Sequence, residues 1–535
     1  MSQLLKLSNI NFGKDDATIE AKSGFLGKVF LKTSFYNRVK SGQKFLVTGR
    51  KGSGKSAICF YLIEALKSEK INTIFVNSRS LSKLRMQQLQ DTSINEKEKF
   101  ESVWRYELLV KIAIKLLDVV DSEGANIFLL GSKEKKQLRE MKRFLSQNNE
   151  FKKDLWQRIS SFSKIFSKFS AKFPGGLEAG LETKQIETIR DLSNMLDKFE
   201  NSISCLLDKS DIFRTTILID EIDDIWDHTE DSKSLIVGLL DAVNKLNASL
   251  NPNAVILVFL RSDIWDSLGF AGKDKYRSAD ELISWSDADL KQLIANRGRV
   301  ITDLVGCSNS NEDVISILFD KKVRSRSSLD YIIERTLKRP REAIQFCNLA
   351  LSIAQDNGHL RITEEDILSA ESRYSVWKLD DLMNEFSVQY PFLRDTLNIF
   401  DGFQKSFSIS DMALRFESSQ KVLSPRFPKV LDLDPSSFLQ ILFGIGFVGA
   451  KVGGKDLYLH DEPDRPRIVL TNLSDLEMII IHPAFHSALG LSRYRSNDIN
   501  LIQINNNLNF SIQIGGSNIG NIVFKEENNS DDSNP

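Results

Sequence analysis

Eight residues near the N-terminus have the spacing of a phosphate-binding loop. The residues Gly49, Arg50, Lys51, Gly52, Ser53, Gly54, Lys55 and Ser56 match the pattern GxxxxGK[ST] at every fixed position. The glycines let backbone N–H groups turn inward around a phosphate, and the helix that follows at Ala57 adds its dipole. We expect Lys55 to bridge two phosphates and Ser56 to ligate magnesium. A chance glycine turn is the alternative, and the flanking strand and helix argue against it.

Two acids follow an apolar run further along the chain. Residues 217–219 lead directly into Asp220 and Glu221. A buried strand can deliver Asp220 to a magnesium ion opposite the phosphate loop, and Glu221 can polarise an attacking water. Apolar runs followed by acids also occur at helix starts, so this interpretation depends on the loop upstream. The next acids are expected on a solvated helix face, with a second metal site as the alternative: Asp223, Asp224 and Asp227.

Two arginines are candidates for sensing a nucleotide. Arg261 ends the apolar run 255–260 and would face the γ-phosphate from the strand beside the acidic one. A structural salt bridge from Arg261 to Asp220 or Glu221 is the alternative. Arg341 lies in a basic cluster at a proline-initiated helix, and it could reach the phosphates from a lid or serve only in packing.

Another pair of basic residues, Lys275 and Arg277, precedes the last expected strand of the sheet. If subunits pack side by side, Lys275 or Arg277 could enter a neighbour's site as an arginine finger. A solvated surface position is the alternative for both side chains. A catalytic role of Lys275 or Arg277 would therefore require a homo-oligomer.

Strands and helices alternate around these residues. Apolar runs predict strands at residues 43–48, 71–76, 216–219 and 255–260, a weaker strand at 281–285, and a helix at 57–67. This alternation predicts an α/β fold, with a parallel sheet covered by helices on both faces.

The rest of the chain is predicted to form further segments around this core. The core takes residues 1–80 and 201–290, a charged helical insertion 81–200, and a helical lid 291–376, with a helix start at Thr363. Residues 377–495 are expected to form a winged-helix-like domain, because helices precede a glycine-bearing hairpin that starts at Gly449. In the tail, 496–535, the runs 501–504 and 510–514 alternate as paired strands do, and the last residues are expected to be disordered.

Composition sets the broad class of the protein. The chain has 535 residues, with 71 Lys and Arg against 72 Asp and Glu, so any nucleic-acid surface must be a local patch. No stretch has the length or the apolar character of a membrane span, and no signal peptide is evident. The four cysteines form no disulfide framework. We therefore expect a cytoplasmic protein without a membrane partner.

One local patch is basic and aromatic. Residues 131–176 hold nine Lys and three Arg against four acids. Within them an aromatic stripe at helical spacing is formed by Phe162, Phe166, Phe169 and Phe173, with Lys164, Lys168 and Lys172 on another face. The favoured interpretation is an amphipathic helix with a core stripe, and the alternative is a surface for nucleic acid or an acidic partner.

The order of these motifs resembles the AAA+ and STAND branch of P-loop ATPases. The layout is similar to that of Orc/Cdc6-type ATPases, and KGSGKSAI, LIDEIDDIW, FLRSDIWD, LISW, KRPREAI and IHPAF resemble a family of poorly characterised bacterial P-loop ATPases. The resemblance covers about residues 8–490. It implies ATP and Mg²⁺ as cofactors, a 51432-type sheet, Asp220 and Glu221 for magnesium and water, and Arg261 and Arg341 as sensors. The lid motif KRPRE departs from the usual family forms, and the insertion is long for either group.

Two classes of function follow. The first is an ATPase acting as a switch or oligomerisation module, with a signalling scaffold that hydrolyses ATP slowly as a variant of it. Relatives of this type in bacterial stress or anti-phage systems suggest the setting by analogy alone. The second is an ATP-regulated DNA- or RNA-binding protein that uses the winged helix and the basic insertion. The winged-helix region interleaves basic and acidic residues, which favours a protein partner. A metal site at His482 and His486 lacks the further ligands that it would need.

Overall fold

The structure is a computed structural model. It describes residues 7, 10–77, 96–123, 130–154, 157, 189–302, 311–461 and 478–491, and the strands at 510–514 and 517–522. The predicted aromatic and lysine stripes at 162–173, the strand at 501–504 and the polar end of the tail lie outside these residues. The chain divides into two compact units, residues 1–370 and 371–535, and each is described by itself.

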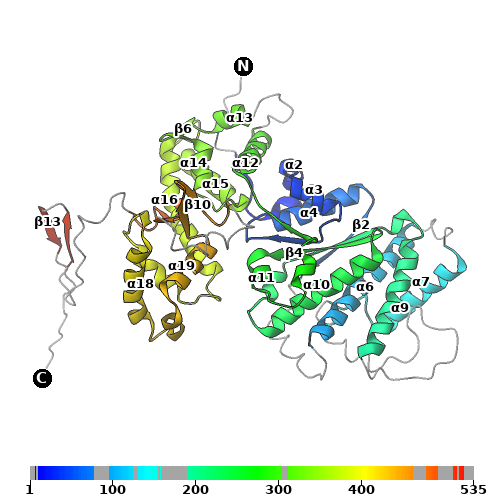
Figure 1. Ribbon diagram of the computed structural model, residues 1–535. Helices are drawn as coiled ribbons and strands as arrows, with labels where there is room; N and C mark the ends of the chain where they lie inside the picture. The colour runs from blue at the N-terminus through cyan, green and yellow to red at the C-terminus, as the bar shows by residue number, and fades with distance from the viewer. Residues whose placement is uncertain are drawn as a thin grey trace, which may run out of the picture. The chain divides into compact units, whose positions relative to one another are not determined.

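A five-stranded parallel sheet forms the centre of the first unit (Figure 1). Its strands are β1 (Leu46–Gly49), β2 (Asn72–Asn77), β3 (Thr215–Asp220), β4 (Ala254–Arg261) and β5 (Asp280–Leu282). They lie in the order β2-β3-β4-β1-β5 with every pairing parallel, which is the 51432 order, so the α/β prediction is confirmed. Every residue of β1 and β3 is buried, which explains why these strands are continuous apolar runs.

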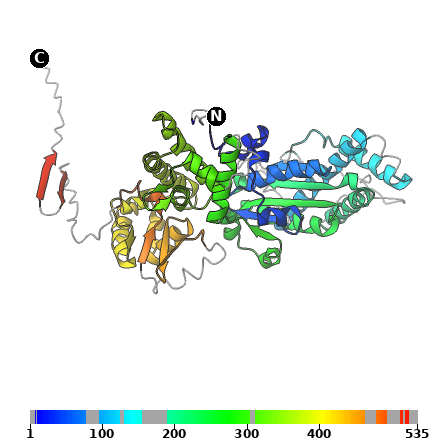
Figure 2. The same cartoon turned by 90° about the horizontal axis from the view of Figure 1, so that it is seen from above.

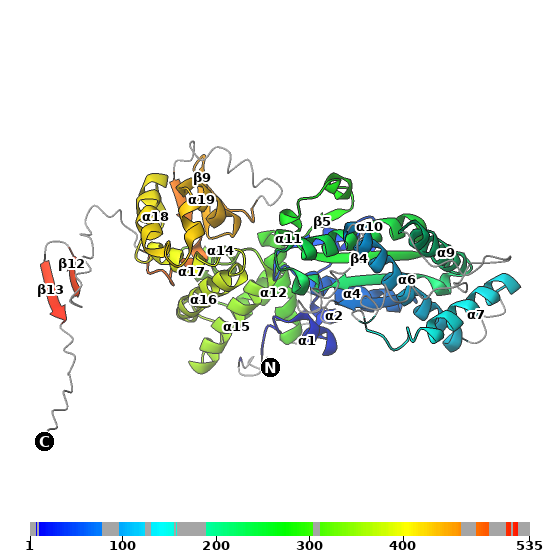
Figure 3. The same cartoon turned by 90° about the horizontal axis from the view of Figure 1, so that it is seen from below.

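Helices cover both faces of this sheet, as right-handed crossovers require (Figure 3). One face carries α4 (Lys55–Ser68), against which α1 (Ala17–Lys22) and α2 (Phe25–Val29) pack, while α3 (Ser34–Lys40) contacts β5. The connections from β3 to β4 and from β4 to β5 place α10 (Glu230–Leu250) and α11 (Ser262–Ser267) on the other face. Short 3₁₀ turns complete the unit: η4 (Asp211–Phe213), η5 (Ile222–Ile225) and η6 (Lys273–Tyr276).

The described helices of the predicted insertion share the core of the sheet. These helices are α6 (Glu96–Glu123), α7 (Ser132–Gln147) and α9 (Ile189–Leu207), and Figure 2 shows α6 lying along the sheet. The helix α6 packs along α10, and Trp104 Nε1 donates a hydrogen bond to the carbonyl of Leu235 (3.1 Å). Arg105 of α6 pairs with Asp197 and Glu200 of α9. All three helices contribute to the hydrophobic cluster that contains β1, β3 and β4.

The lid is formed by helices that follow the sheet. They are α12 (Asp287–Ile301), α13 (Asn311–Leu318), α14 (Ser328–Glu334), α15 (Pro340–Asp356) and α16 (Glu364–Glu385), and α16 begins directly after Thr363 as predicted. The expectation that the lid, residues 291–376, is helical is wrong at one point. A short hairpin, β6 (Lys322–Val323) with β7 (Arg326–Ser327), turns at Arg324 in the left-handed conformation (φ 54°).

The second unit contains a four-stranded antiparallel sheet in the order β10-β9-β11-β8. Its elements are α17 (Leu393–Leu397), η7 (Asn398–Phe400), β8 (Ser406–Phe407), α18 (Ile409–Leu423), η8 (Pro428–Asp432), α19 (Pro435–Gly444), β9 (Val448–Val452), β10 (Lys455–Leu457), β11 (Met478–Ile481) and η10 (Pro483–Phe485). The hairpin expected from Gly449 is β9 with β10, whereas the winged-helix assignment stays a prediction.

The described residues of the tail form a hairpin, β12 (Phe510–Ile514) with β13 (Ser517–Ile522), whose register shifts between Ser511 and Gln513. The predicted strand at 510–514 is therefore present, and its described partner is β13. Across the described parts of the chain, no helix combines the length and the hydropathy needed to cross a membrane.

Candidate nucleotide-binding site

The parallel sheet brings the predicted residues to one edge. Gly49 at the end of β1 pairs in register with Arg261 at the end of β4, and Asp220 ends β3, next to β4. Because the carboxyl ends of parallel strands share an edge, the phosphate loop, the acids and Arg261 lie together. Helix α4 begins at Lys55, so its N-terminus points into the same place.

The loop itself depends on two glycines in the left-handed region. Gly52 has φ 80° and Gly54 has φ 100°, values that residues other than glycine rarely adopt. A Cβ on Gly52 would also lie 3.3 Å from the Cβ of Arg341. Lys55 Nζ donates hydrogen bonds to the carbonyls of Gly49 (2.8 Å) and Arg50 (3.2 Å), which holds the lysine inside the turn.

Asp220 is a buried carboxylate whose environment suits a bound cation. Its side chain is 3% exposed, and its Oδ1 accepts a hydrogen bond from the backbone N–H of Glu221 (2.8 Å). Burial raises the pKa of Asp220, against the lowering effect of hydrogen bonds from the Ser56 side chain and from that N–H. Its Oδ2 is buried and accepts no hydrogen bond within the described residues. A magnesium ion beside Ser56 and Asp220 would supply the missing interaction, so these residues fit the metal.

Glu221 is held in an unusual backbone conformation. It has φ 62° and ψ 32°, the left-handed region, and it precedes η5. For a residue other than glycine this conformation costs about 1 kcal/mol, and such residues concentrate at functional sites. The left-handed turn at Glu221 ends the extended strand conformation immediately after Asp220.

The charge around Lys55 involves more residues than the sequence indicated. Burial lowers the pKa of Lys55, while Asp223 and then Asp220 favour its protonated form and Arg261 opposes it. Asp223, expected on a solvated face, is thus within electrostatic range of the loop. Arg261 forms a bidentate ion pair with Asp263 (Nη2 to Oδ2, 2.7 Å; Nε to Oδ1, 3.1 Å). The structural salt bridge considered for Arg261 therefore has a partner that sequence analysis did not name.

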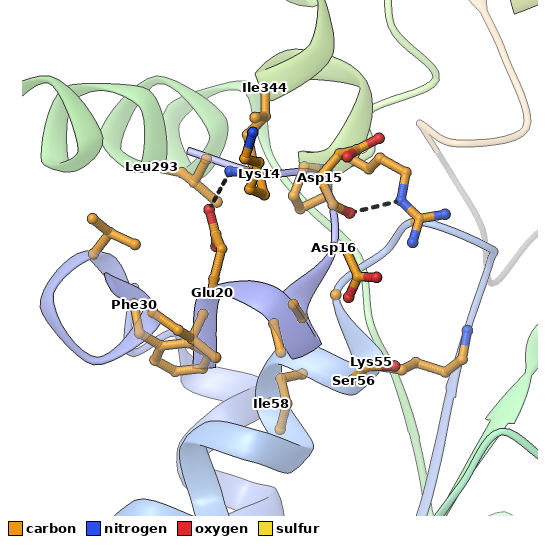
Figure 4. Close-up of a pocket in the computed structure, with 18 of the residues that line it drawn as sticks. Lys14, Asp15, Asp16, Glu20, Phe30, Lys55, Ser56, Ile58, Leu293 and Ile344 are labelled. Atoms are coloured by element: carbon orange, nitrogen blue, oxygen red, sulfur yellow. Dashed lines mark hydrogen bonds between the residues drawn. The ribbon is translucent and has the colours of Figure 1, made fainter. Parts of the chain in front are cut away.

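A cavity of about 250 Å³ lies beside the loop (Figure 4). Phosphate-loop residues Lys55 and Ser56 line one end of it. The rest of the lining is mixed. It combines charged side chains, Lys14, Asp15, Asp16, Glu20, Glu221, Arg297 and Arg341, with apolar ones, Leu26, Val29, Phe30, Leu31, Phe35, Ile58, Leu293 and Ile344. A cavity with apolar walls and a few polar groups beside a phosphate-binding loop suits the base and sugar of a nucleotide.

Arg341 connects this cavity to the lid. Its backbone N–H donates to the carbonyl of Gly52 (3.4 Å), and its Nε donates to the carbonyl of Asp15 (3.1 Å). Partial burial alone would raise the pKa of Asp16, but hydrogen bonds from Thr18 and the charge of Arg341 lower it overall. The predicted lid arginine thus lies against both the phosphate loop and the N-terminal segment.

The N-terminal segment is fastened to the lid by a buried ion pair. Arg297 of α12 makes two hydrogen bonds to Glu20 of α1 (2.6 and 2.8 Å) and one to the carbonyl of Phe12 (2.7 Å), and both charged side chains are at most 6% exposed. Asn348 of α15 bonds the same segment at Phe12 and Gly13 (both 2.8 Å). Since α1 packs on α4, contacts run from the lid through this segment to the phosphate-loop helix.

Trp285 supports the loop from the end of β5. Its Nε1 donates a hydrogen bond to the carbonyl of Ser53 (2.8 Å), and its ring lies 3.8 Å from where a Cβ on Gly54 would be. Phe35 contacts the indole edge to face, with ring centroids 5.6 Å apart. Residues 281–285 were expected to form a strand, but β5 ends at Leu282, which leaves Trp285 free of the sheet to reach the loop.

We expect Trp285→Phe to weaken nucleotide binding about fivefold, because the Ser53 carbonyl loses a hydrogen bond of about 1 kcal/mol while the ring is kept. Equilibrium titration with a fluorescent nucleotide measures this. Trp377→Phe is the matched control, since that indole is 53% exposed and lies in the second unit. Equal affinity in both variants would show that the hydrogen bond does not set the loop.

The candidate arginine fingers are in different environments. Lys275 Nζ donates to Asp241 Oδ1 (2.6 Å) and lies 5.1 Å from the ring centroid of Tyr276, so it stabilises its own subunit. Arg277 is exposed, and the part of the chain that the structure describes contains no ion pair to it. Between the two, Arg277 is the residue that could reach a neighbouring molecule.

Sequence reasoning named the loop, the acids and two candidate sensor arginines. The structure brings the loop, the acids and Arg261 to one edge of the sheet, and places Arg341 of α15 against the loop at Gly52. Sequence reasoning missed Trp285, Arg297, Glu20 and the N-terminal wall of the cavity. LISW was noted as a motif, but no residue pattern indicated what its tryptophan bonds. The partners of Arg297, Glu20 and Phe12, lie 277 and 285 residues away in the sequence, so no local signal could reveal them.

One family model matches part of the chain. It is described as the FunZ-associated C-terminal helical domain, and it matches residues 288–383, which are the lid helices. A relative from Escherichia coli (strain K12), the transposon gamma-delta 80.3 kDa protein, is 25% identical over 504 residues, which are 89% of this chain and 67% of the relative.

The solved structures with a similar fold have low sequence identity to this chain and low TM-scores. The Aeropyrum pernix ORC1 protein in complex with DNA has a TM-score of 0.36 at 12% identity, with 89% of this chain and 96% of that chain covered. The Thermotoga maritima RuvB Holliday junction branch migration motor has a TM-score of 0.29 at 9% identity, with 84% and 95% covered. These similarities are too weak to support an argument, so the function is argued from the site.

Proposed function

We propose that the chain is a magnesium-dependent ATPase that acts as a nucleotide-controlled switch or oligomerisation module in the cytoplasm. The observation that carries this proposal is that Lys55, Ser56, Asp220 and Glu221 lie at one edge of the sheet, beside a cavity that suits a nucleotide. A setting in bacterial stress or anti-phage defence, in the manner of STAND ATPases, is part of the proposal and rests on the sequence resemblance alone.

Each residue has a chemical task under this proposal. The loop N–H groups and Lys55 hold the phosphates, and Ser56 and Asp220 hold Mg²⁺, which neutralises phosphate charge when bound. Glu221 orients and polarises the attacking water. No cluster of three or more His, Cys, Asp or Glu side chains is placed to hold a metal in the described ranges, so the nucleotide's own oxygens would complete the magnesium shell.

The lid and the N-terminal segment would convert nucleotide state into movement. Arg341 contacts the loop at Gly52, and the Arg297–Glu20 pair ties α12 to α1. Release of phosphate would remove charge from the end of the cavity that these contacts border. The proposal is tested by multiple-turnover phosphate release from Mg-ATP, with light scattering of the same samples. Turnover that ceases with EDTA supports it, and no turnover with no nucleotide-dependent change in size would contradict it.

If the module works in an assembly, Arg277→Ala should lower turnover at least about tenfold, because an arginine finger in trans stabilises transition-state charge. ATP affinity should change little. Mixing Arg277→Ala with Lys55→Ala should restore part of the activity, since the second variant supplies the missing arginine to the first one's intact site. Failure of the mixture to recover would mean that Arg277 does not act between subunits.

For the second unit we propose contact with a protein. Helix α19 immediately precedes the β9–β10 hairpin, which is the place of a recognition helix in a winged-helix domain, and its sequence PSSFLQILFG contains no Lys or Arg. Direct reading of DNA needs side chains of that kind. The alternative function, an ATP-regulated DNA- or RNA-binding protein, is thus less favoured, and duplex binding that weakens with salt would restore it.

A further inference from the structure

Helix α18 (Ile409–Leu423) of the second unit carries apolar side chains on its outer face as well as on its core face (Figure 1). Met412 and Phe416 are buried and form the core face. On the side turned away from this core, Leu414 is 69% exposed and Val422 is 76% exposed. An amphipathic helix normally places polar residues at such positions, so these two side chains depart from the pattern and mark the face as a candidate for contact.

The exposed row on α18 is symmetric about a small residue. Leu414, Ser418 and Val422 follow one another at intervals of four, so they form a row along the helix with the apolar side chains about 6 Å to either side of Ser418. The hydroxyl of Ser418 donates a hydrogen bond to the carbonyl of Leu414 in the same helix (2.9 Å). This donor is therefore satisfied, and the small side chain lets a second helix approach closely at this point.

We propose that this row is a self-association surface, on which α18 of a second copy of the chain packs antiparallel across Ser418. A two-fold axis at Ser418 brings Leu414 of each copy against Val422 of the other, so the same apolar contact is made twice. Both exposed apolar side chains are covered in this way. The occupant of the surface is thus the same helix of a second copy.

Charge on one flank of the row fits the antiparallel arrangement. Glu417 and Lys421 lie on that flank and are exposed. Equivalent flanks meet when identical helices pack antiparallel about Ser418, and the positions of Lys421 in one copy and Glu417 in the other then differ by only about 3 Å along the helix axis. A parallel pair would instead oppose like charges, which is unfavourable. On the other flank, Arg415 is held by its own unit, with its guanidinium 4.1 Å from the ring centroid of Phe403.

The inference rests on the proposed protein contact of the second unit, for which it names the partner, and not on ATP hydrolysis. Two leucine–valine contacts form a small interface, and interfaces below about 1,200 Å² are typical of weak, transient association. We therefore expect a reversible dimer that forms as the protein concentration rises. A two-fold contact is complete with two copies, so it is distinct from the side-by-side packing in which Arg277 would act.

The test exchanges charges across the paired positions in the full-length protein without nucleotide. Leu414→Glu and Val422→Lys should each raise the dissociation constant of the dimer at least about tenfold, because each places two charges against apolar side chains. The double variant Leu414→Glu/Val422→Lys should dimerise again, because a carboxylate of each copy then faces an ammonium group of the other. An equal mixture of the two single variants should also recover, as a heterodimer. Val388→Glu, at a side chain of the same unit that is 68% exposed, is the matched control.

Sedimentation velocity over a concentration series measures each dissociation constant, and circular dichroism with thermal unfolding checks the fold of every variant. We expect the wild type and Val388→Glu to dimerise alike, and each single variant to stay monomeric where the wild type is dimeric. A wild type that is monomeric throughout the series, or single variants that dimerise as it does, would overturn the proposal. So would a folded double variant that stays monomeric, because position 414 would then not face position 422. ATP titration of the same samples tests the ATPase proposal separately, so either proposal can fail without the other.

Discussion

Lys55→Ala should abolish measurable ATP binding, with a loss of at least about a hundredfold in affinity, or about 2.7 kcal/mol. The structure holds the side chain of this lysine inside the turn, with its Nζ bonded to the carbonyls of Gly49 and Arg50. Phosphates would offer that ammonium group stronger, charge-assisted hydrogen bonds. Fluorescent-nucleotide titration and calorimetry measure the loss directly.

The control for Lys55→Ala is Lys51→Ala, in the same loop. Lys51 is exposed, and it occupies a variable position of the pattern. Its substitution should change affinity by no more than a surface charge does, about 1 kcal/mol. If both substitutions weaken binding equally, the loop attracts nucleotide only by its general positive charge, and the assigned role of Lys55 is wrong.

Glu221→Gln should keep ATP bound while lowering turnover by about a hundredfold or more, because general-base assistance contributes roughly that much. The substitution preserves the size of the side chain and removes its ability to take up a proton. Asp220 and Ser56 remain, so magnesium and ATP should still bind. Single-turnover phosphate release, measured beside equilibrium binding, separates the two steps.

The companion variant Asp224→Asn tests whether any nearby acid would give the same result. Asp224 lies three residues further along, in η5, and is exposed. Its turnover should match that of the wild type. Normal phosphate release by Glu221→Gln would show that Glu221 is not the catalytic base. Asp223 would then be the next candidate, because among the nearby acids it does most to favour the protonated form of Lys55.

The sheet was predictable because its central strands, β1, β3 and most of β4, are buried on both faces. Continuous apolar runs mark such strands, and the observed boundaries of β2, β3 and β4 differ from the predicted ones by one residue at each end. The short edge strand β5 was placed less well, since three residues carry little pattern. The small hairpin in the lid escaped notice for the same reason, because β6 and β7 have only two residues each.

The site divides along similar lines. Residues in a fixed local spacing, such as Lys55 and Ser56, could be found by pattern, and Asp220 by its strand. Contacts made by folding could not: the pairing of Arg297 with Glu20, and the hydrogen bond from Trp285 to Ser53 across 232 residues. The ion pair of Arg261 with Asp263 lies within three residues, yet sequence analysis considered only Asp220 and Glu221 as partners of this arginine.

The most direct test of the central claim is calorimetric titration of the full-length wild-type protein with ATP, in the presence of magnesium and again with EDTA. We predict one saturable site per chain that weakens at least about tenfold when magnesium is removed, since Ser56 and Asp220 then lose the ion that they share with the phosphates. Absence of saturable binding, or binding indifferent to magnesium, would contradict the account that this sheet edge is an ATP and magnesium site.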